Sequence, residues 1–156
     1  MENTLFKTII QTRKNFIELI ETSTIEEVKL VRAGFNNNII WNFGHLISSQ
    51  QILCYKLANV APIVADQYIL DYQKGTKPEK FIEAEEINIL KDLALNTIDK
   101  LAEDLNNNVF VSYNTRTTSY GIELRSTIEA VQFFPIHDAY HYGIASSIKK
   151  VLNKSK

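Results

Sequence analysis

The sequence predicts an all-α protein, a four-helix bundle with long crossover connections. Glycine and proline, which break helices, number only 5 and 3 in 156 residues. Apolar residues recur at steps of three and four along four long segments, as expected for helices with one buried face. The links between these segments are uneven, and one or two are long enough to be crossovers of a bundle. The length is that of one domain, residues 1–156.

The first two helices are predicted over residues 3–22 and 37–59. The first segment places its apolar side chains on roughly one face. These are Leu5, Phe6, Ile9, Phe16, Ile17 and Ile20. The second segment is strongly apolar ("IIWNFGHL", "ILCYKLA") but carries a polar face that includes Asn38, Asn42 and His45. Polar groups that face the inside of a bundle need partners or a ligand.

The other two helices are predicted over residues 84–105 and 126–152. Three glutamates at the start of the third segment favour the positive end of a helix dipole. The last segment begins with "STIE", in which Ser126 and Glu129 fit a capping box. Pro135 lies inside this segment, so the helix either bends or breaks there, or begins later than the capping box suggests.

The three links differ in character. Residues 23–36 form a link of moderate length. Residues 60–83 contain a short helix around "DQYILDY", followed by the turn-rich "QKGTKPEK". Residues 106–125 are rich in Asn, Thr and Tyr and lack helical periodicity, which predicts a loop or a small hairpin.

Composition and charge narrow the function classes. The net charge is -1, which argues against a protein that binds nucleic acid or an anionic membrane surface through many phosphate contacts. Charged residues interrupt the N-terminal apolar stretch, so it does not read as a signal peptide. Cys54 is the only cysteine and allows no intrachain disulfide, which fits a reducing compartment. We therefore expect a cytoplasmic protein.

The three histidines are the main candidates for a functional site. His137 and His141 are four residues apart, so they lie on one face of a helix and can share a metal ion. The residues between them lack the glutamate of the HExxH motif of zinc proteases. His45 is the only other histidine and the natural third ligand. For each histidine alone, a buried or solvated side chain without a metal is the preferred interpretation, and only the set indicates a divalent metal site.

Several neighbours of these histidines have more than one interpretation. Asn42 lies one turn before His45 and either supports a metal ligand or forms a cap or interhelical hydrogen bond. Asp138 points about 100° away from His137, which predicts a solvated or helix-stabilising carboxylate. Cys54 lies about 180° round the helix from His45 and is not expected to be a ligand. Trp41 is expected to be an aromatic residue of the core or its rim.

Two segments resemble the DinB-like family of bacterial proteins, also called DinB/YfiT-like metalloenzymes. They are "NNNIIWNFGHLISSQQILCYKLAN" and "FFPIHDAYHYGIASSIKKVL". The family pattern places Asn, Ile, Trp and His on the second helix and His-x-x-x-His-x-Gly on the fourth. Here the second part falls on His137, His141 and Gly143, and the first ends at Trp41 and His45. "KGTKP" at 74–78 also resembles a linker found in many members.

The resemblance implies a four-helix bundle that holds a divalent metal, usually nickel or zinc, through His45, His137 and His141. It also implies a homodimer, and an activity on small molecules such as the transfer of low-molecular-weight thiols, or hydrolysis. Two positions depart from the family, because Tyr142 and Ile144 stand where many members have Arg and Gln. The loss of the Gln weakens the case for a proton-transfer role at that point.

Three functional hypotheses follow. The first is a metal-dependent enzyme, a thiol transferase or hydrolase, which requires an open position on the metal and an adjacent pocket. The second is a non-catalytic, stress-related metal-binding bundle, which predicts a coordination sphere closed by a fourth protein ligand. The third is a bundle without metal, in which the imidazoles lie apart or are individually hydrogen-bonded. The sequence assigns no general acid or base.

Overall fold

The computed structural model describes residues 2–79 and 82–154 and confirms the all-α fold class. Its four long helices are α1 (Glu2–Glu21), α3 (Ile39–Gln50), α5 (Ala84–Asn106) and α6 (Thr127–Lys154). Between them lie α2 (Ile25–Lys29), the π-helical turn η1 (Gln51–Lys56), α4 (Asp66–Tyr72), and the strands β1 (Arg116–Thr117) and β2 (Glu123–Leu124).

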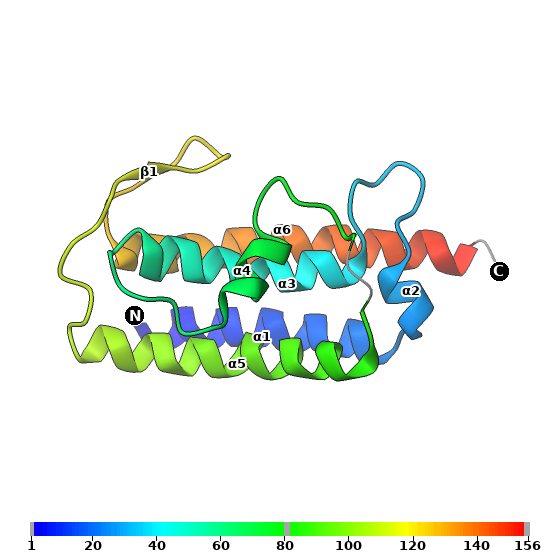
Figure 1. Ribbon diagram of the computed structural model, residues 1–156, viewed down its shortest axis with the longest axis horizontal. Coiled ribbons are helices and arrows are strands. Elements are labelled where there is room, and N and C mark those ends of the chain that lie inside the picture. The colour runs from blue at the N-terminus through cyan, green and yellow to red at the C-terminus, as the bar shows by residue number, and fades with distance from the viewer. Residues whose placement is uncertain (1, 80–81, 155–156) are drawn as a thin grey trace.

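The long helices form a bundle in which each one packs against two neighbours. Helices α3 and α6 lie side by side, as do α1 and α5, and α3 also packs on α5 and α1 on α6. Helices α1 and α6 run in one direction and α3 and α5 in the other (Figure 1). The links after α2 and α4 and the β1–β2 hairpin all rise on the side of the bundle formed by α3 and α6.

The second predicted helix is divided in the structure. Residues 37–59 were expected to form one α-helix, but α3 changes to the wider η1 turn after Gln50. Asn38 caps the start of α3, because its side-chain oxygen accepts a hydrogen bond from the backbone N–H of Trp41 at 2.8 Å. The preceding link contains α2, which the sequence analysis did not predict and which begins with a capping box formed by Thr24 and Glu27.

The last helix begins at Thr127 and continues through Pro135, so the alternative of a later start is excluded. Only half of the predicted capping box is present. The Ser126 hydroxyl accepts from the N–H of Glu129 at 3.1 Å, as predicted. The Glu129 carboxylate instead accepts from the N–H of Arg125 at 2.7 Å, one residue before the expected donor. The hydrogen bonds at the start of α6 therefore extend one residue further toward the N-terminus, to Arg125.

The other links agree with their predictions and resolve one alternative. The segment "DQYILDY" is α4, as expected. Within residues 106–125, Arg116 pairs with Leu124 and Thr117 with Glu123 in an antiparallel hairpin. The hairpin interpretation of this segment is therefore the one that the structure supports.

The core consists of two apolar clusters with a polar layer between them. Phe16, Phe43 and Ile148 belong to the first cluster, and Ile9, Tyr55 and Phe134 belong to the second. Between the clusters, each long helix contributes one buried polar side chain. This polar layer consists of Arg13, Gln50, Thr97 and Asp138. No described helix combines the length and the apolar character that crossing a membrane requires.

Gly44 allows α4 to lie against α3 at close range. A β-carbon at this position would come within 2.5 Å of the Tyr72 ring, which is shorter than a van der Waals contact. Because Tyr72 ends α4, this contact brings the end of that helix next to His45. The glycine in "WNFGHL" therefore has a packing role.

Candidate metal centre

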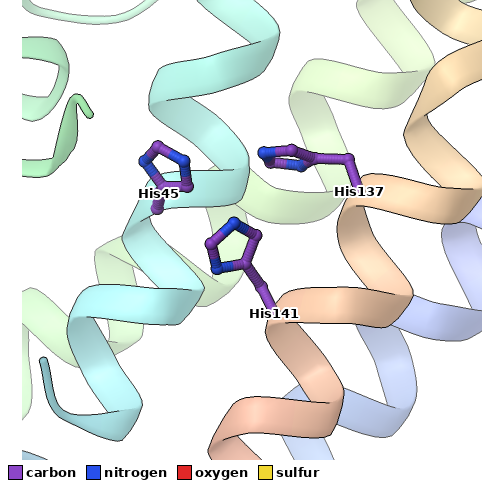
Figure 2. Close-up of side chains that lie close together, drawn as sticks. All are labelled: His45, His137 and His141. Atoms are coloured by element: carbon purple, nitrogen blue, oxygen red, sulfur yellow. The ribbon is translucent and has the colours of Figure 1, made fainter. Parts of the chain in front are cut away.

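The three histidines meet between α3 and α6. His45 projects from α3, and His137 and His141 project from successive turns of α6 toward it (Figure 2). One nitrogen from each ring lies within 4.8 Å of the other two. The ring centroid of His45 lies 5.3 Å from that of His137 and 4.6 Å from that of His141. The imidazoles are therefore not separated, and the hypothesis of a bundle without metal stands only in its second form, in which each ring is hydrogen-bonded individually. We call these three residues the histidine cluster.

The ring of His45 is oriented by the backbone of α4. Its Nδ1 lies 2.6 Å from the carbonyl oxygen of Tyr72. A carbonyl oxygen only accepts hydrogen bonds, so Nδ1 carries the proton and donates it. Nε2 is left with a lone pair that accepts from the Ser49 hydroxyl at 3.2 Å. On its other side the ring stacks on Trp41, with centroids 4.8 Å apart.

The ring of His141 is oriented by Asn42. The Asn42 side-chain oxygen lies 2.9 Å from Nδ1 of His141. The orientation of the amide is fixed, because its NH2 group donates to the carbonyl of Asn38 at 2.8 Å. The amide oxygen therefore accepts from Nδ1–H, and Nε2 of His141 keeps its lone pair. The side chain of Asn42 therefore forms an interhelical hydrogen bond, and its partner is one of the candidate metal ligands. Both interpretations left open for Asn42 are compatible with this contact.

The ring of His137 is oriented by the carboxylate of its neighbour Asp138. Asp138 Oδ1 lies 3.2 Å from Nδ1 of His137, and Oδ2 accepts from Nε of Arg13 at 3.0 Å. Both Arg13 and Asp138 are fully buried. The expectation of a solvated carboxylate at Asp138 is wrong, because the side chain turns into the bundle, where a buried guanidinium from α1 compensates its charge.

Burial keeps two histidines of the cluster, His45 and His141, uncharged. It lowers the pKa of His45 to about 4, with a further contribution from the neighbouring His137, although the Tyr72 carbonyl opposes the shift. Burial likewise lowers the pKa of His141 to about 3, with contributions from His137 and His45. Burial alone would raise the pKa of Asp138, but Arg13 and the His137 hydrogen bond outweigh it and hold that pKa below its usual value. His45 and His141 are therefore neutral at neutral pH, the form in which imidazole binds metals.

Sequence reasoning missed the Arg13–Asp138 pair, although a signal was present. Ile9, Arg13, Phe16 and Ile20 follow steps of four, three and four, so Arg13 lies within the buried stripe of α1. The polar layer also holds Arg13 in place. Its Nη1 donates to Gln50 and to the carbonyl of Ala94, both at 2.9 Å.

The donor set of the histidine cluster fits a divalent transition metal. In each ring Nδ1 is engaged by an acceptor, so Nε2 carries the lone pair that can bind a metal, and in His45 a metal would replace the Ser49 hydroxyl there. Imidazole suits zinc, nickel, copper and iron. Hydrogen bonds from the other ring nitrogen to a carbonyl, an amide and a carboxylate are typical of metal-binding histidines. Among the described residues, the group that could hold the ion contains no carboxylate or thiol.

Cys54 lies elsewhere, as the sequence predicts. It is fully buried in the second apolar cluster, where burial raises the pKa of its thiol.

The histidine cluster opens into a cavity of about 770 Å³, a volume typical of small-molecule sites. Its walls come from α3, α6, the links after α2 and α4, and the β1–β2 hairpin. Trp41 and Ile144 line it, whereas Tyr142 packs against Phe16 with ring centroids 5.7 Å apart. Ile144, which replaces the Gln of many members, thus gives the cavity an apolar wall. "KGTKP" contributes the Thr76 hydroxyl, which accepts from Nε1 of Trp41 at 3.0 Å.

Comparison with known proteins agrees with this geometry. A family model described as the DinB superfamily matches residues 8–145, which include the three histidines and all four members of the polar layer. The chain therefore belongs to the DinB superfamily, and the resemblance of its two histidine segments is confirmed. A comparison with curated proteins finds no match.

Proposed function

We propose that this member of the DinB superfamily is a metal-dependent enzyme that acts on a small molecule. The observation that carries the proposal is the histidine cluster, in which one nitrogen from each of three rings lies within 4.8 Å of the others at the wall of a cavity. We assign His45, His137 and His141 as the ligands of a divalent ion, with nickel and zinc as the expected metals. A bound ion of this kind supplies a Lewis acid that lowers the pKa of a coordinated thiol or water.

Hydrogen-bond acceptors around the cluster fix the orientation of each histidine ring and determine which of its nitrogens carries the proton. The Tyr72 carbonyl, Asn42 and Asp138 keep each Nδ1 protonated and aim each Nε2 at the same point. These contacts are made before any ligand arrives, so little side-chain entropy remains to be lost on binding. Asp138 also adds a buried negative charge behind His137, which favours a cation at the cluster.

The number of ligands favours a catalytic over a structural ion. Structural zinc sites are closed by four protein ligands, whereas catalytic sites have three and leave a position for water or substrate. The cluster offers three among the described residues, and the cavity begins beside it. This supports the enzyme hypothesis over the non-catalytic, stress-related metal-binding protein.

The remaining details extend the proposal. We propose thiol transfer as the reaction, with hydrolysis as the alternative, because a metal held by the three histidines would lower the pKa of a thiol enough for solvent to take its proton without a protein carboxylate. No acidic residue occurs among the described residues that line the cavity. We also propose a single domain over residues 1–156, a homodimer as the resemblance implies, and a cytoplasmic location that suits the single reduced cysteine.

Metal analysis of untagged protein tests the proposal. We expect wild-type protein to bind close to one equivalent of Ni²⁺ or Zn²⁺, and the His141→Ala variant to lose at least about 100-fold in affinity, since one of three ligands is gone. His141 is only partly buried, so the variant should remain folded, which circular dichroism would verify. Equal metal content in the two proteins would remove the proposed site. The single cysteine variant Cys54→Ala is a control that should keep its metal.

A further inference from the structure

The rim of the cavity carries an unbalanced positive charge. Lys74 and Lys77 follow α4, and Arg116 lies in β1, so the three come from two links that rise on the same side of the bundle (Figure 1). All three are exposed, and none forms an ion pair with a described residue. We call Lys74, Lys77 and Arg116 the rim cations.

No negative charge faces the rim cations from the cavity wall. The described residues that line the cavity include no Asp or Glu, although the protein as a whole has a net charge of -1. The nearest buried carboxylate, Asp138, lies behind His137 and is neutralised by Arg13. A cavity with walls of low polarity and charge of one sign concentrates ligands of the opposite sign.

The cavity is also lined by apolar and aromatic side chains. These include Trp41, Phe133, Tyr140 and Ile144. Such side chains bind the hydrocarbon or aromatic body of a ligand, and a few polar groups fix its orientation. The lining therefore combines three kinds of group: cationic, apolar and metal-binding.

We propose that the cavity binds small molecules with an anionic oxygen group, a carboxylate or a phosphate-type group, held by the rim cations. The apolar body of the ligand lies along the aromatic wall, and its other end faces the histidine cluster. This inference deepens the proposed function, on which it rests for the metal at the cluster. The recognition of the anion itself needs only the rim cations.

Rigid aromatic thiols separate the two ends of the proposed site. In 4-mercaptobenzoate the thiol and the carboxylate lie at opposite ends of a ring, so both cannot bind one ion. The neutral isostere 4-mercaptobenzamide and the dianionic 4-mercaptophenylphosphonate complete the series. Their affinities would be measured by isothermal titration calorimetry with zinc-loaded protein, and repeated with metal-free protein.

We expect zinc-loaded wild-type protein to bind the carboxylate about 5–30-fold more tightly than the amide at low salt, from three partly solvated charge pairs. The preference should shrink several-fold at about 1 M salt, where charges are screened within about 3 Å. A higher affinity for the phosphonate than for the carboxylate would identify phosphate-type ligands as the better fit.

A matched pair of triple variants tests the location of the anion site. Replacing the rim cations together (Lys74→Gln, Lys77→Gln and Arg116→Gln) should abolish the preference and leave zinc affinity within about threefold. The control replaces three exposed lysines that do not line the cavity (Lys7→Gln, Lys56→Gln and Lys150→Gln). This control changes the net charge by the same amount as the first triple variant. Because its three lysines do not line the cavity, it should keep most of the preference for the carboxylate over the amide.

The outcomes distinguish this inference from the proposed function. If wild-type protein binds zinc but shows no preference for the anions, or if both triple variants lose it equally, the anion site is wrong and the metal site stands. If zinc does not bind, the metal site is wrong. In that case the titrations of metal-free protein still test the anion site, because binding of the anion depends only on the rim cations.

Discussion

Two buried aspartates in this bundle have similar local surroundings and different positions relative to the cavity. Asp138 accepts from Arg13 and His137, and Asp104 accepts from the Tyr55 hydroxyl at 2.8 Å and from Nζ of Lys100 at 2.6 Å. Each carboxylate therefore has one cationic partner and one further hydrogen-bond partner. The number of hydrogen bonds does not distinguish a carboxylate that supports a site from one that supports the fold.

The two aspartates differ in the solvent exposure of their cationic partners. Arg13 is fully buried, so the charge of Asp138 has no access to water and depends on a single cation. The Lys100 side chain is 43% exposed, so its partner, the Asp104 carboxylate, lies close to solvent. A buried ion pair contributes little net stability but is costly to break. Here the carboxylate of the pair also contacts a histidine of the cluster.

The largest expected effect follows from removing one cation from each pair. Arg13→Met should destabilise the metal-free protein by about 3–5 kcal/mol, because it leaves Asp138 as an uncompensated buried charge. Lys100→Met should change stability far less, since water can approach Asp104 in its place. Urea unfolding of both variants measures the comparison. Similar losses in the two variants would show that the two aspartates are energetically equivalent.

A smaller effect should separate the aspartates by metal binding instead of stability. Asp138→Asn should weaken Zn²⁺ binding about 10–100-fold, as is usual when the hydrogen-bond partner of a metal-binding histidine is changed. Asp104→Asn should leave the affinity unchanged, because Asp104 contacts no residue of the cluster. Competition titration against a chelating dye measures both on folded protein. Asp138 has no positioning role if the two variants bind zinc with equal affinity.

The smallest effect concerns the uncharged partner of Asp104. Tyr55→Phe removes one hydrogen bond and should cost about 0.5–1.5 kcal/mol of stability. The Lys100 contact remains, so the carboxylate keeps a partner. Zinc affinity should stay at the wild-type value. Thermal unfolding and the same dye titration check the two halves of this expectation, and a loss of zinc affinity would connect this remote pair to the site.

The sequence predicted most of the fold because helices are specified locally. The four long segments and the short α4 follow from apolar periodicity and turn residues, and the hairpin was one of two alternatives for residues 106–125. Two local details were missed: the change to a π-helical turn after Gln50, and α2. The first has no distinct sequence signature, and the second is a helix of five residues whose capping box was present but was not read.

The candidate site was predicted in part. The spacing of His137 and His141 follows from helix geometry, and His45 followed by elimination and from the resemblance. The acceptors that orient the rings were less accessible. Asn42 was identified as a candidate, Asp138 was assigned to solvent, and the Tyr72 carbonyl could not be anticipated, since a backbone oxygen leaves no trace in the residue pattern.

The sequence by itself determined the helices, the two histidines that share a face of α6, and the absence of a glutamate between them. These depend on neighbours within one or two helical turns. Only the tertiary structure decided that Arg13 meets Asp138, 125 positions away, and that two distant links place their cations around one cavity. Such contacts depend on the packing and register of helices far apart in the chain, which local periodicity leaves free.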